Sequence, residues 1–224
     1  MPITIGNVLD EADLAGVAEL LPQLMWTDGT KTAGAVAREV KRNRQADLST
    51  RSGTRLRELV QTALRTHPVV QAFARPAKWS PFIVSQTGEG GGYGTHIDNA
   101  FMGAGDNRVR TDLSFTLFLS EPDSHEGGEL NIDMAGMTHS VKGARGDLVI
   151  YPSTTLHQVA EVTRGRRIVC VGWIQSLIRS GDQREILFDL DNLKAELLAS
   201  HDKNSPELLT LTKTLANLTR MWGE

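Results

Sequence analysis

Apolar residues recur along the chain at two different spacings, and the change of spacing divides it into three parts. Over residues 1–78 and again over residues 179–224 they return every three or four positions, which is the period of an amphipathic helix. Over residues 79–178, short apolar or alternating runs are separated by Gly, Pro, Asp and Asn, which is typical of strands joined by turns. We therefore predict an N-terminal helical support region, a β core and a C-terminal helical region with these bounds.

The N-terminal part predicts a short strand over residues 3–8 and three helices after it. Asp10 is suited to cap the first helix, with Leu9 and Leu14 placed to contact each other across the cap. The other two helices are expected over residues 33–42 and 54–66, and the second of these ends before a His-Pro pair that disfavours helical backbone.

Basic residues are concentrated between residues 38 and 57. They form either a basic lip over a site for an anionic substrate or a solvated helix face. The second interpretation is favoured, because runs of charge usually face water. The residues are Arg38, Lys41, Arg42, Arg44, Arg51, Arg55 and Arg57.

The central part predicts many short strands, and strands at this spacing are typical of a sandwich or a jelly roll. Over residues 113–119 every odd position is apolar, while Ser114 and Thr116 share the other, more polar face. Two glycine-containing stretches, 126–129 and 142–147, are interpreted as turns without chemistry. The strands are expected over residues 79–87, 113–120, 129–133, 138–142, 148–151, 157–162 and 167–175.

The C-terminal part predicts two helices. An apolar stripe from Ile186 to Leu197 marks the first, and Ser205-Pro206 supplies a cap and a first-turn proline for the second. The apolar residues of the second helix, from Leu208 to Trp222, form a seam that packs either on the β core or on another subunit. Homo-oligomer formation is therefore a hypothesis for this chain.

Composition restricts the classes of function. The chain has 224 residues, 40% hydrophobic content and a net charge of -3, so it can bury a core and gives no argument for nucleic acid or a membrane as partner. No apolar run is long enough to span a membrane, and the N-terminus lacks the pattern of a secretory signal. The single cysteine, Cys170, is expected to be a small buried hydrophobic residue. A single thiol cannot form an internal disulfide and favours a reducing compartment, so we expect a cytoplasmic location.

Three residues have the pattern of a metal site. His96 and Asp98 are two positions apart, so on an extended strand their side chains point to the same face, about 6.6 Å apart. Two protein ligands are too few, and His157 on a later predicted strand is the best candidate for the third. Two His and one carboxylate on one face of a metal, with the other positions open, are typical of non-haem Fe(II) oxygenases. We therefore predict that these three residues bind Fe(II).

Arg167 is the candidate anion-binding residue. It follows His157 by ten residues and opens the apolar run 168–174, where an arginine requires an anionic partner. Its guanidinium group can bind a carboxylate through two parallel hydrogen bonds. Arg166 is the rival, but neighbours on a strand point to opposite faces, so only one of the two enters the barrel. The other histidines, His67, His125, His139 and His201, are expected to be structural or solvated, and Asn43 and Asn99 are weaker candidates for substrate contacts.

Motifs spread over nearly the whole chain occur in one combination. They are Ala33-Gly34 and residues 40–45 near the start, Tyr93–Asn99, residues 111–114, 126–130, 151–153, Leu156-His157, residues 162–165, Arg167 and residues 173–176 in the core, and residues 184–190, Asn217-Leu218 and Trp222 at the end. This combination resembles the bacterial PKHD-type hydroxylases, which are prolyl-4-hydroxylase-like Fe(II)/2-oxoglutarate dioxygenases.

The resemblance implies a mainly β fold with flanking helices around a double-stranded β-helix (jelly roll) core. It implies that His96, Asp98 and His157 hold Fe(II) and that Arg167 binds the distal carboxylate of 2-oxoglutarate. O2 would be the second cosubstrate, with ascorbate as an optional addition. The expected reaction couples oxidative decarboxylation of 2-oxoglutarate to succinate with hydroxylation of a small-molecule or peptide substrate. Several family members lie near iron-uptake genes, which suggests a link to iron or siderophore handling.

One position departs from the family pattern. Family members often have a tyrosine near position 87 that helps to hold the cosubstrate, whereas this chain has Thr87. A threonine hydroxyl has a shorter reach, so we do not expect it to replace the phenol. Tyr93 is expected to line the pocket instead.

Two other interpretations compete with the dioxygenase. A cupin-like metal protein without oxygenase activity would more often have His-x-His together with a Glu, which this chain lacks at the expected place. A non-catalytic binding module with the same fold would not need an intact triad and Arg167.

Overall fold

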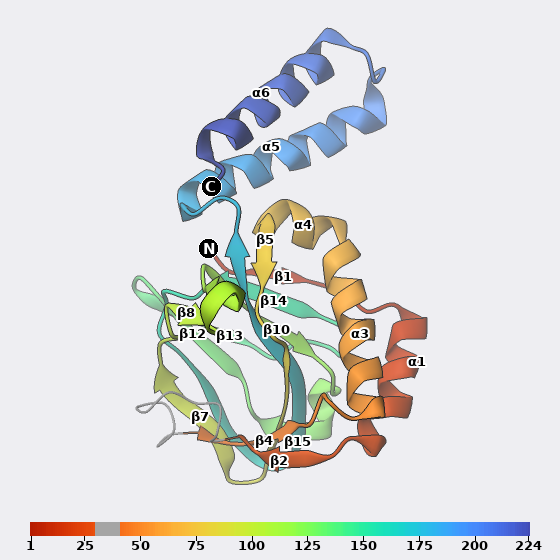
Figure 1. Ribbon diagram of the computed structural model, residues 1–224, viewed down its shortest axis with the longest axis vertical. Helices are drawn as coiled ribbons and strands as arrows, with labels where there is room; N and C mark the ends of the chain where they lie inside the picture. Colours follow the sequence, from red (N-terminus) through yellow and green to blue (C-terminus); the bar gives the residue numbers. More distant parts are fainter. Residues whose placement is uncertain (30–40) are drawn as a thin grey trace.

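The computed structural model describes residues 1–29 and 41–224, and these form a β barrel with helices along one side and a helical hairpin at one end (Figure 1). The helices are α1 (Glu11–Leu20), α3 (Arg51–Thr66), α4 (Pro68–Ala74), α5 (Gly181–Ser200) and α6 (Pro206–Trp222), with short 3-10 helices η1 (Leu21–Gln23), η3 (Gly105–Asn107) and η4 (Pro122–Ser124). The strands are β1 (Ile3–Ile5), β2 (Trp26–Asp28), β3 (Lys41–Arg42), β4 (Arg44–Ala46), β5 (Pro76–Trp79), β6 (Ile83–Gly88), β7 (Gly91–His96), β8 (Phe101–Met102), β9 (Val109–Arg110), β10 (Leu113–Phe118), β11 (His125–Gly127), β12 (Leu130–Met134), β13 (Met137–Val141), β14 (Leu148–Pro152) and β15 (His157–Ser176).

Two antiparallel sheets share the longest strand, β15. Its second half, residues 166–176, lies in a sheet with the order β1-β14-β10-β15-β6-β4-β2. Its first half, residues 157–165, pairs with β7, β11 and β12 of the opposite sheet. Because one strand belongs to both sheets, they close into a double-stranded β-helix, which confirms the predicted fold.

Helices α1, α3 and α4 cover the outer face of the first sheet (Figure 1). The stripe Leu56, Val60 and Leu64 of α3 is almost completely buried against this sheet, and burial of each such side chain stabilises the fold by about 1.5–3 kcal/mol. The predicted cap of α1 is confirmed, because the Asp13 amide donates to the Asp10 carboxylate at 2.8 Å. The N-terminal region therefore both supports the barrel and supplies edge strands to it.

Three expectations for the N-terminal half need correction. The helix predicted over residues 33–42 is wrong at its end, where Lys41 and Arg42 form β3 and pair with β7, while residues 33–40 lie outside the described part of the chain. The strand predicted over residues 79–87 is interrupted between β5 and β6, where Pro81 has no N–H for a ladder hydrogen bond. The first strand is also shorter than predicted and ends at Ile5.

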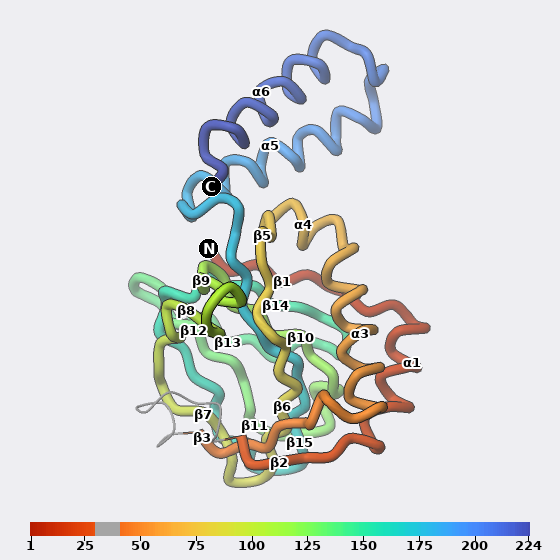
Figure 2. Tube along the Cα trace, viewed as in Figure 1, coloured from red at the N-terminus to blue at the C-terminus, as the bar shows by residue number. Residues whose placement is uncertain are grey.

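The strands predicted over residues 157–162 and 167–175 are a single strand, β15. The break between residues 162 and 167 that these bounds imply is absent, although the backbone of Gly165 is left-handed, with φ +79°. A Cβ at Gly165 would lie 2.2 Å from the Ser124 carbonyl oxygen, so glycine is required by the close passage of the neighbouring chain. The chain continues along β15 out of the barrel and into α5, as the trace in Figure 2 shows.

Helices α5 and α6 form a hairpin that projects from the barrel (Figure 1). The predicted seam of α6 packs on α5 rather than on the β core, with Leu215 in a cluster that includes Leu187 of α5 and Ile178, which follows β15. Ile186, Leu193 and Leu209 remain exposed on the hairpin. Within residues 1–29 and 41–224, no helix is both long and apolar enough to cross a membrane.

Candidate functional site

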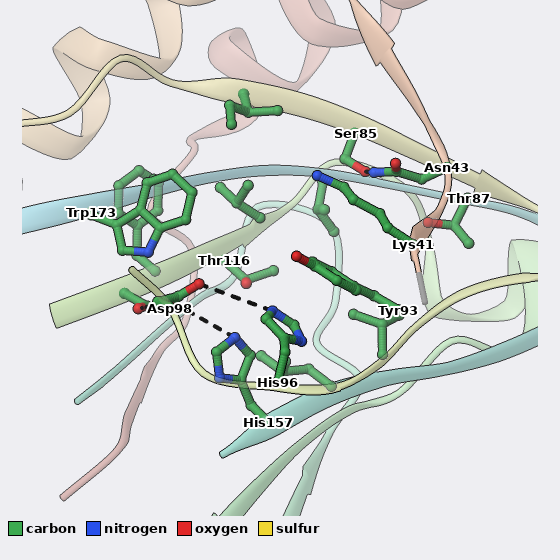
Figure 3. Close-up of a pocket in the computed structure, with 18 of the residues that line it drawn as sticks. Lys41, Asn43, Ser85, Thr87, Tyr93, His96, Asp98, Thr116, His157 and Trp173 are labelled. Atoms are coloured by element: carbon green, nitrogen blue, oxygen red, sulfur yellow. Dashed lines mark hydrogen bonds and ion pairs between the residues drawn. The ribbon is translucent and has the colours of Figure 1, made fainter. Parts of the chain in front are cut away.

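The predicted metal ligands meet at one end of the barrel cavity (Figure 3). His96 ends β7 and is the direct cross-strand partner of His157, the first residue of β15. Asp98 follows two residues after His96, and its carboxylate oxygens lie 4.0 Å from the His96 Nε2 and 3.6 Å from the His157 Nε2. One ligand atom from each residue lies within 4.8 Å of the other two. The three side chains can therefore face a single metal ion.

Hydrogen bonds fix the orientation of all three side chains. The Nδ1 of His96 lies 2.8 Å from the Gly94 carbonyl, and the Nδ1 of His157 lies 3.1 Å from the Thr155 carbonyl. A carbonyl can only accept, so each Nδ1 carries the proton and each Nε2 is left as a ligand. Burial, assisted by His157, lowers the pKa of His96 and favours its neutral, metal-binding form.

The third ligand is held by a pair of serines. The Ser114 hydroxyl donates to the Asp98 carboxylate at 2.6 Å, and the Ser153 hydroxyl lies 2.7 Å behind it. Ser114 is on the more polar face predicted for β10, and the structure turns that face toward the cavity. Two neutral imidazoles and one hydrogen-bonded carboxylate are a donor set that suits Fe(II).

Arg167 lines the same cavity and Arg166 does not. The side chain of Arg167 is 3% exposed, whereas Arg166 is exposed on the outer face, as strand alternation predicts. Burial lowers the pKa of Arg167 to about 10, against the opposing effects of Tyr151 and Glu129, so it remains a cation at neutral pH. Its Nε has no hydrogen-bond partner among the described residues. A buried guanidinium with an unpaired N–H facing a cavity can bind an anionic ligand.

His125 lies next to Arg167, and of the two expected states, structural or solvated, it has the structural one. Its side chain is 5% exposed, because β11 packs against β15 under the barrel cavity. A Cβ on Gly128 would lie 3.0 Å from the Arg167 Cδ and 3.2 Å from a His125 ring carbon, which places the two side chains next to each other. Burial and the charges of Lys142 and Arg167 lower the pKa of His125. His125 is therefore a neutral neighbour of Arg167, whereas His139 and His201 are exposed as expected.

Tyr93 lies between the metal ligands and a lysine. Its ring stacks on His96 with a centroid separation of 3.6 Å, and the Lys41 Nζ lies 5.2 Å from the centre of the tyrosine ring. Burial and the nearby Asp98 raise the pKa of Tyr93 to about 12, so its hydroxyl stays protonated. Thr87 also lines the cavity and is the cross-strand partner of Arg167.

The family of the chain follows from the comparisons with known proteins. The model of the 2OG-Fe(II) oxygenase superfamily matches residues 82–175, and that of the PKHD-type hydroxylase C-terminal domain matches residues 182–224. A PKHD-type hydroxylase of Hyphomonas neptunium is 57% identical over 222 residues, which is 99% of each chain. The chain belongs to the PKHD-type hydroxylase family. It is an Fe(II)- and 2-oxoglutarate-dependent dioxygenase with an HxD…H triad, which decides against the cupin-like alternative.

Another family member is similar over the whole chain, and solved structures share the fold. A PKHD-type hydroxylase of Acaryochloris marina is 42% identical over all 224 residues. A prolyl hydroxylase of Trichoplax adhaerens, solved with a hypoxia inducible factor peptide fragment, is similar with a TM-score of 0.58 and 13% identity, over 83% of this chain and 86% of that one. A Pseudomonas putida prolyl-4-hydroxylase is similar with a TM-score of 0.51 and 19% identity, over 78% of this chain and 92% of that one. At these identities the solved structures show the fold alone.

Several cavity residues of this PKHD-type hydroxylase escape sequence reasoning. Lys41 was interpreted within a solvated basic face, yet it is buried and lines the cavity, while Arg42 and Arg44 next to it are exposed. Tyr151 is buried near Arg167 and Asp98, and burial raises the pKa of its phenol. The indole N–H of Trp173 is buried without a partner among the described residues and belongs to the cavity wall. Side chains alternate between the two faces of each strand, and this pattern can be read from the sequence. The pattern does not show which of the two faces is turned toward the cavity.

Proposed function

We propose that His96, Asp98 and His157 hold the Fe(II), that Arg167 binds the distal carboxylate of 2-oxoglutarate, and that Tyr93 lines the site. The observation that carries this proposal is the shared cavity, of about 110 Å³, in which the three ligand atoms and the buried guanidinium face one space. When bound, the metal and cosubstrate would supply the oxidation, in which a substrate C–H bond, O2 and 2-oxoglutarate give the hydroxylated substrate, succinate and CO2, with one oxygen atom in the hydroxyl group and the other in succinate.

The side chains of the chain orient and shield this chemistry. The Arg167 guanidinium offers N–H donors to one carboxylate, and the Tyr151 phenol, whose pKa is raised by burial, lies near that guanidinium. Ser114 keeps the Asp98 carboxylate in place, so that it would be held ready to bind the metal together with the two imidazoles. The aliphatic side chains of Val169 and Leu130 give the cavity wall an apolar part, which disfavours water inside the cavity.

A groove beside the cavity is suited to the molecule that is hydroxylated. It shares Ile97 and Asp98 with the cavity, and it runs past Phe101 to Arg179 and the start of α5. Ile97 and Phe101 are both exposed, which gives the mouth of the site an apolar rim. A small molecule or a short peptide segment could enter along this rim, and we propose one of these two as the substrate.

The experiment that tests the proposal compares two neighbouring arginines. We expect Arg167→Ala to leave Fe(II) binding nearly intact and to weaken 2-oxoglutarate binding by about 2–5 kcal/mol, roughly thirty- to several-thousand-fold. Arg166→Ala is the matched control and should bind 2-oxoglutarate like the unaltered chain. Anaerobic titration of the Fe(II) protein with 2-oxoglutarate, followed by the visible charge-transfer band, measures both. If neither substitution changes the titration, the assignment of Arg167 is wrong.

Four further expectations stay predictions. The cytoplasmic location rests on the single thiol, which is buried in β15. The link to iron or siderophore handling has no support from the comparisons. Ascorbate remains an optional addition to the hydroxylation reaction. A homo-oligomer can no longer rest on the α6 seam, because α5 covers it, and would have to use the exposed apolar residues of the hairpin.

A further inference from the structure

A buried histidine next to Arg167 has no part in the function described so far. His125 begins β11, which pairs with β15, and its side chain is almost completely buried. Polar atoms inside a protein normally have a hydrogen-bond partner. The Nε2 of His125 is buried and has none among residues 1–29 and 41–224. This nitrogen can therefore serve a group that comes close to it when the site is loaded.

The other ring nitrogen of His125 indicates which tautomer is present. The Ser124 hydroxyl donates its only proton to the Glu121 carbonyl at 2.5 Å, and its oxygen lies 3.4 Å from the His125 Nδ1. That oxygen can only accept from the ring, so Nδ1 carries the proton and the Nε2 of the neutral ring is an acceptor. Burial and the charges of Lys142 and Arg167 favour the neutral ring, against the opposing effects of Glu121 and Glu129.

Arg167 supplies the complementary group. Its Nε–H is a buried donor without an acceptor in the described part of the chain. A Cβ on Gly128 would lie 3.0 Å from the Arg167 Cδ and 3.2 Å from the His125 Cδ2, so both carbons lie around one point. These two carbons are bonded directly to the Arg167 Nε and to the His125 Nε2. An unpaired donor and an unpaired acceptor are thus neighbours, and each is costly to leave unpaired in a buried place.

We propose that His125 is a positioning residue for the cosubstrate, whose Nε2 accepts a hydrogen bond from the Arg167 Nε–H when 2-oxoglutarate is bound. This inference rests on the proposed function and adds a residue to it. With Nε held in this way, the guanidinium presents its two terminal NH2 groups to the distal carboxylate, as a bidentate contact requires. His125 is not among the residues that line the cavity, so it acts on the cosubstrate through Arg167.

The first test separates the distal carboxylate from the rest of the cosubstrate. 2-Oxoglutarate and 2-oxopentanoate, which has the same carbon chain without the distal carboxylate, are titrated anaerobically into the Fe(II) protein. We expect His125→Phe, which keeps a ring but no acceptor, to weaken 2-oxoglutarate binding about tenfold. The affinity for 2-oxopentanoate should change less than about twofold. Unchanged 2-oxoglutarate binding, or an equal loss for both acids, would overturn the proposal.

Further variants assign this effect to the pair. His125→Gln retains an acceptor near the place of Nε2 and should bind 2-oxoglutarate within about threefold of the unaltered chain. His139→Gln, at an exposed position, is the control and should not differ from the unaltered chain. In the Arg167→Ala background, His125→Phe should cause no further loss, because the partner is already absent. A further tenfold loss in that background would show that His125 acts without Arg167 and would contradict the proposal.

Nuclear magnetic resonance tests the hydrogen bond in the unaltered chain, so its result does not depend on how a variant folds. The protein is labelled with nitrogen-15 and loaded with 2-oxoglutarate and with diamagnetic Zn(II) in place of Fe(II). We expect a scalar coupling between the Arg167 Nε and the His125 Nε2, which arises only across an N–H···N hydrogen bond. An Arg167 Nε–H without this coupling, exchanging with water as fast as that of the exposed Arg166, would overturn the proposal.

Failure of this inference and failure of the proposed function give different results. If Arg167→Ala binds 2-oxoglutarate like the unaltered chain, the assignment of Arg167 fails and the role of His125 fails with it. If Arg167→Ala weakens 2-oxoglutarate binding severely and His125→Phe does not, only the positioning role of His125 is wrong.

Discussion

The barrel and the C-terminal hairpin use their buried positions in opposite ways. The barrel interior contains Lys41, Ser114, Asp98 and Arg167, polar groups that reduce apolar packing but surround a cavity. The hairpin interior is built on an apolar cluster around Leu215, and the charged side chain buried beside it, Arg184, donates to backbone carbonyl oxygens. The barrel turns its costly polar groups toward a cavity, where a ligand can contact them, whereas the buried guanidinium of the hairpin has backbone carbonyls as its partners.

The hairpin is nevertheless attached firmly to the rest of the chain. The Arg184 guanidinium donates to the carbonyl oxygens of Ile178 and Arg179 at 2.7 and 2.8 Å, which holds the start of α5 against the end of β15. Arg75 after α4 forms an ion pair with Asp191, and Phe73 contacts Phe188 edge-to-face at 5.3 Å. We expect substitutions in the barrel cavity to change the affinities for Fe(II) and 2-oxoglutarate. Substitutions in the interior of the hairpin should change the free energy of unfolding.

The largest effect is expected from Asp98→Ala. This change removes one of the three metal ligands, so the affinity for Fe(II) should fall by more than the roughly 100-fold reached when only a supporting hydrogen bond is lost. Asp133→Ala removes an exposed carboxylate of β12 and is the control. Anaerobic metal titration measures both variants, and unchanged Fe(II) affinity in Asp98→Ala would refute the triad.

In the hairpin, Leu215→Ala should act on stability alone. The loss of a buried leucine should reduce the free energy of unfolding by about 2–4 kcal/mol and leave the affinities for Fe(II) and 2-oxoglutarate unchanged. Leu209→Ala, on the exposed face of α6, should change the free energy of unfolding by less than about 0.5 kcal/mol. Urea unfolding and anaerobic titration give the two quantities. Weakened 2-oxoglutarate binding in Leu215→Ala would mean that the hairpin helps to form the site.

Ser114→Ala tests the support of the metal ligand rather than the ligand itself. Without its 2.6 Å hydrogen bond the Asp98 carboxylate is free to turn, so we expect Fe(II) affinity to fall roughly tenfold. Ser153→Ala removes only the hydroxyl behind Ser114 and should have a smaller effect. Metal titration of the two variants decides this, and equal effects would show that the serines act as one unit.

The smallest effect concerns His125 and pH. Because burial lowers its pKa, the unfolded chain binds more protons than the folded chain once the pH falls below about 6.5. This histidine therefore reduces the stability of the fold as the pH falls through that value, and it has no such effect at higher pH. Urea unfolding at pH 7.5 and 5.5 should show a smaller loss in His125→Gln than in the unaltered chain. His139→Gln, at an exposed position, should not differ from the unaltered chain.

The sequence predicts those features of the fold that depend on residues only a few positions away along the chain. The cap at Asp10 is confirmed, and the strand alternation that separates Arg167 from Arg166 matches the structure, because each depends on residues a few positions away. The His96-x-Asp98 spacing is likewise a local property of an extended chain. The division into regions 1–78, 79–178 and 179–224 stays a proposal.

Positions decided by distant contacts were missed. His125 has polar sequence neighbours and is buried only because β11 pairs with β15. Lys41 belongs to a strand whose partner, β7, lies far along the chain, and Gly165 is needed because Ser124 passes close to it. In each case the deciding neighbour comes from another element, and a one-dimensional pattern contains no information about that neighbour.

The cross-strand pairing of His96 with His157 makes the metal a link between two strands. The register between β7 and β15 shifts between His157 and Val159 and again before Val162, so the backbone ladder beside the ligands is irregular. A ligand that binds only the folded state stabilises it, and here the added stability would be concentrated in this ladder. Amide hydrogen exchange in β7 should therefore slow when metal is bound and report loading of the site without any turnover.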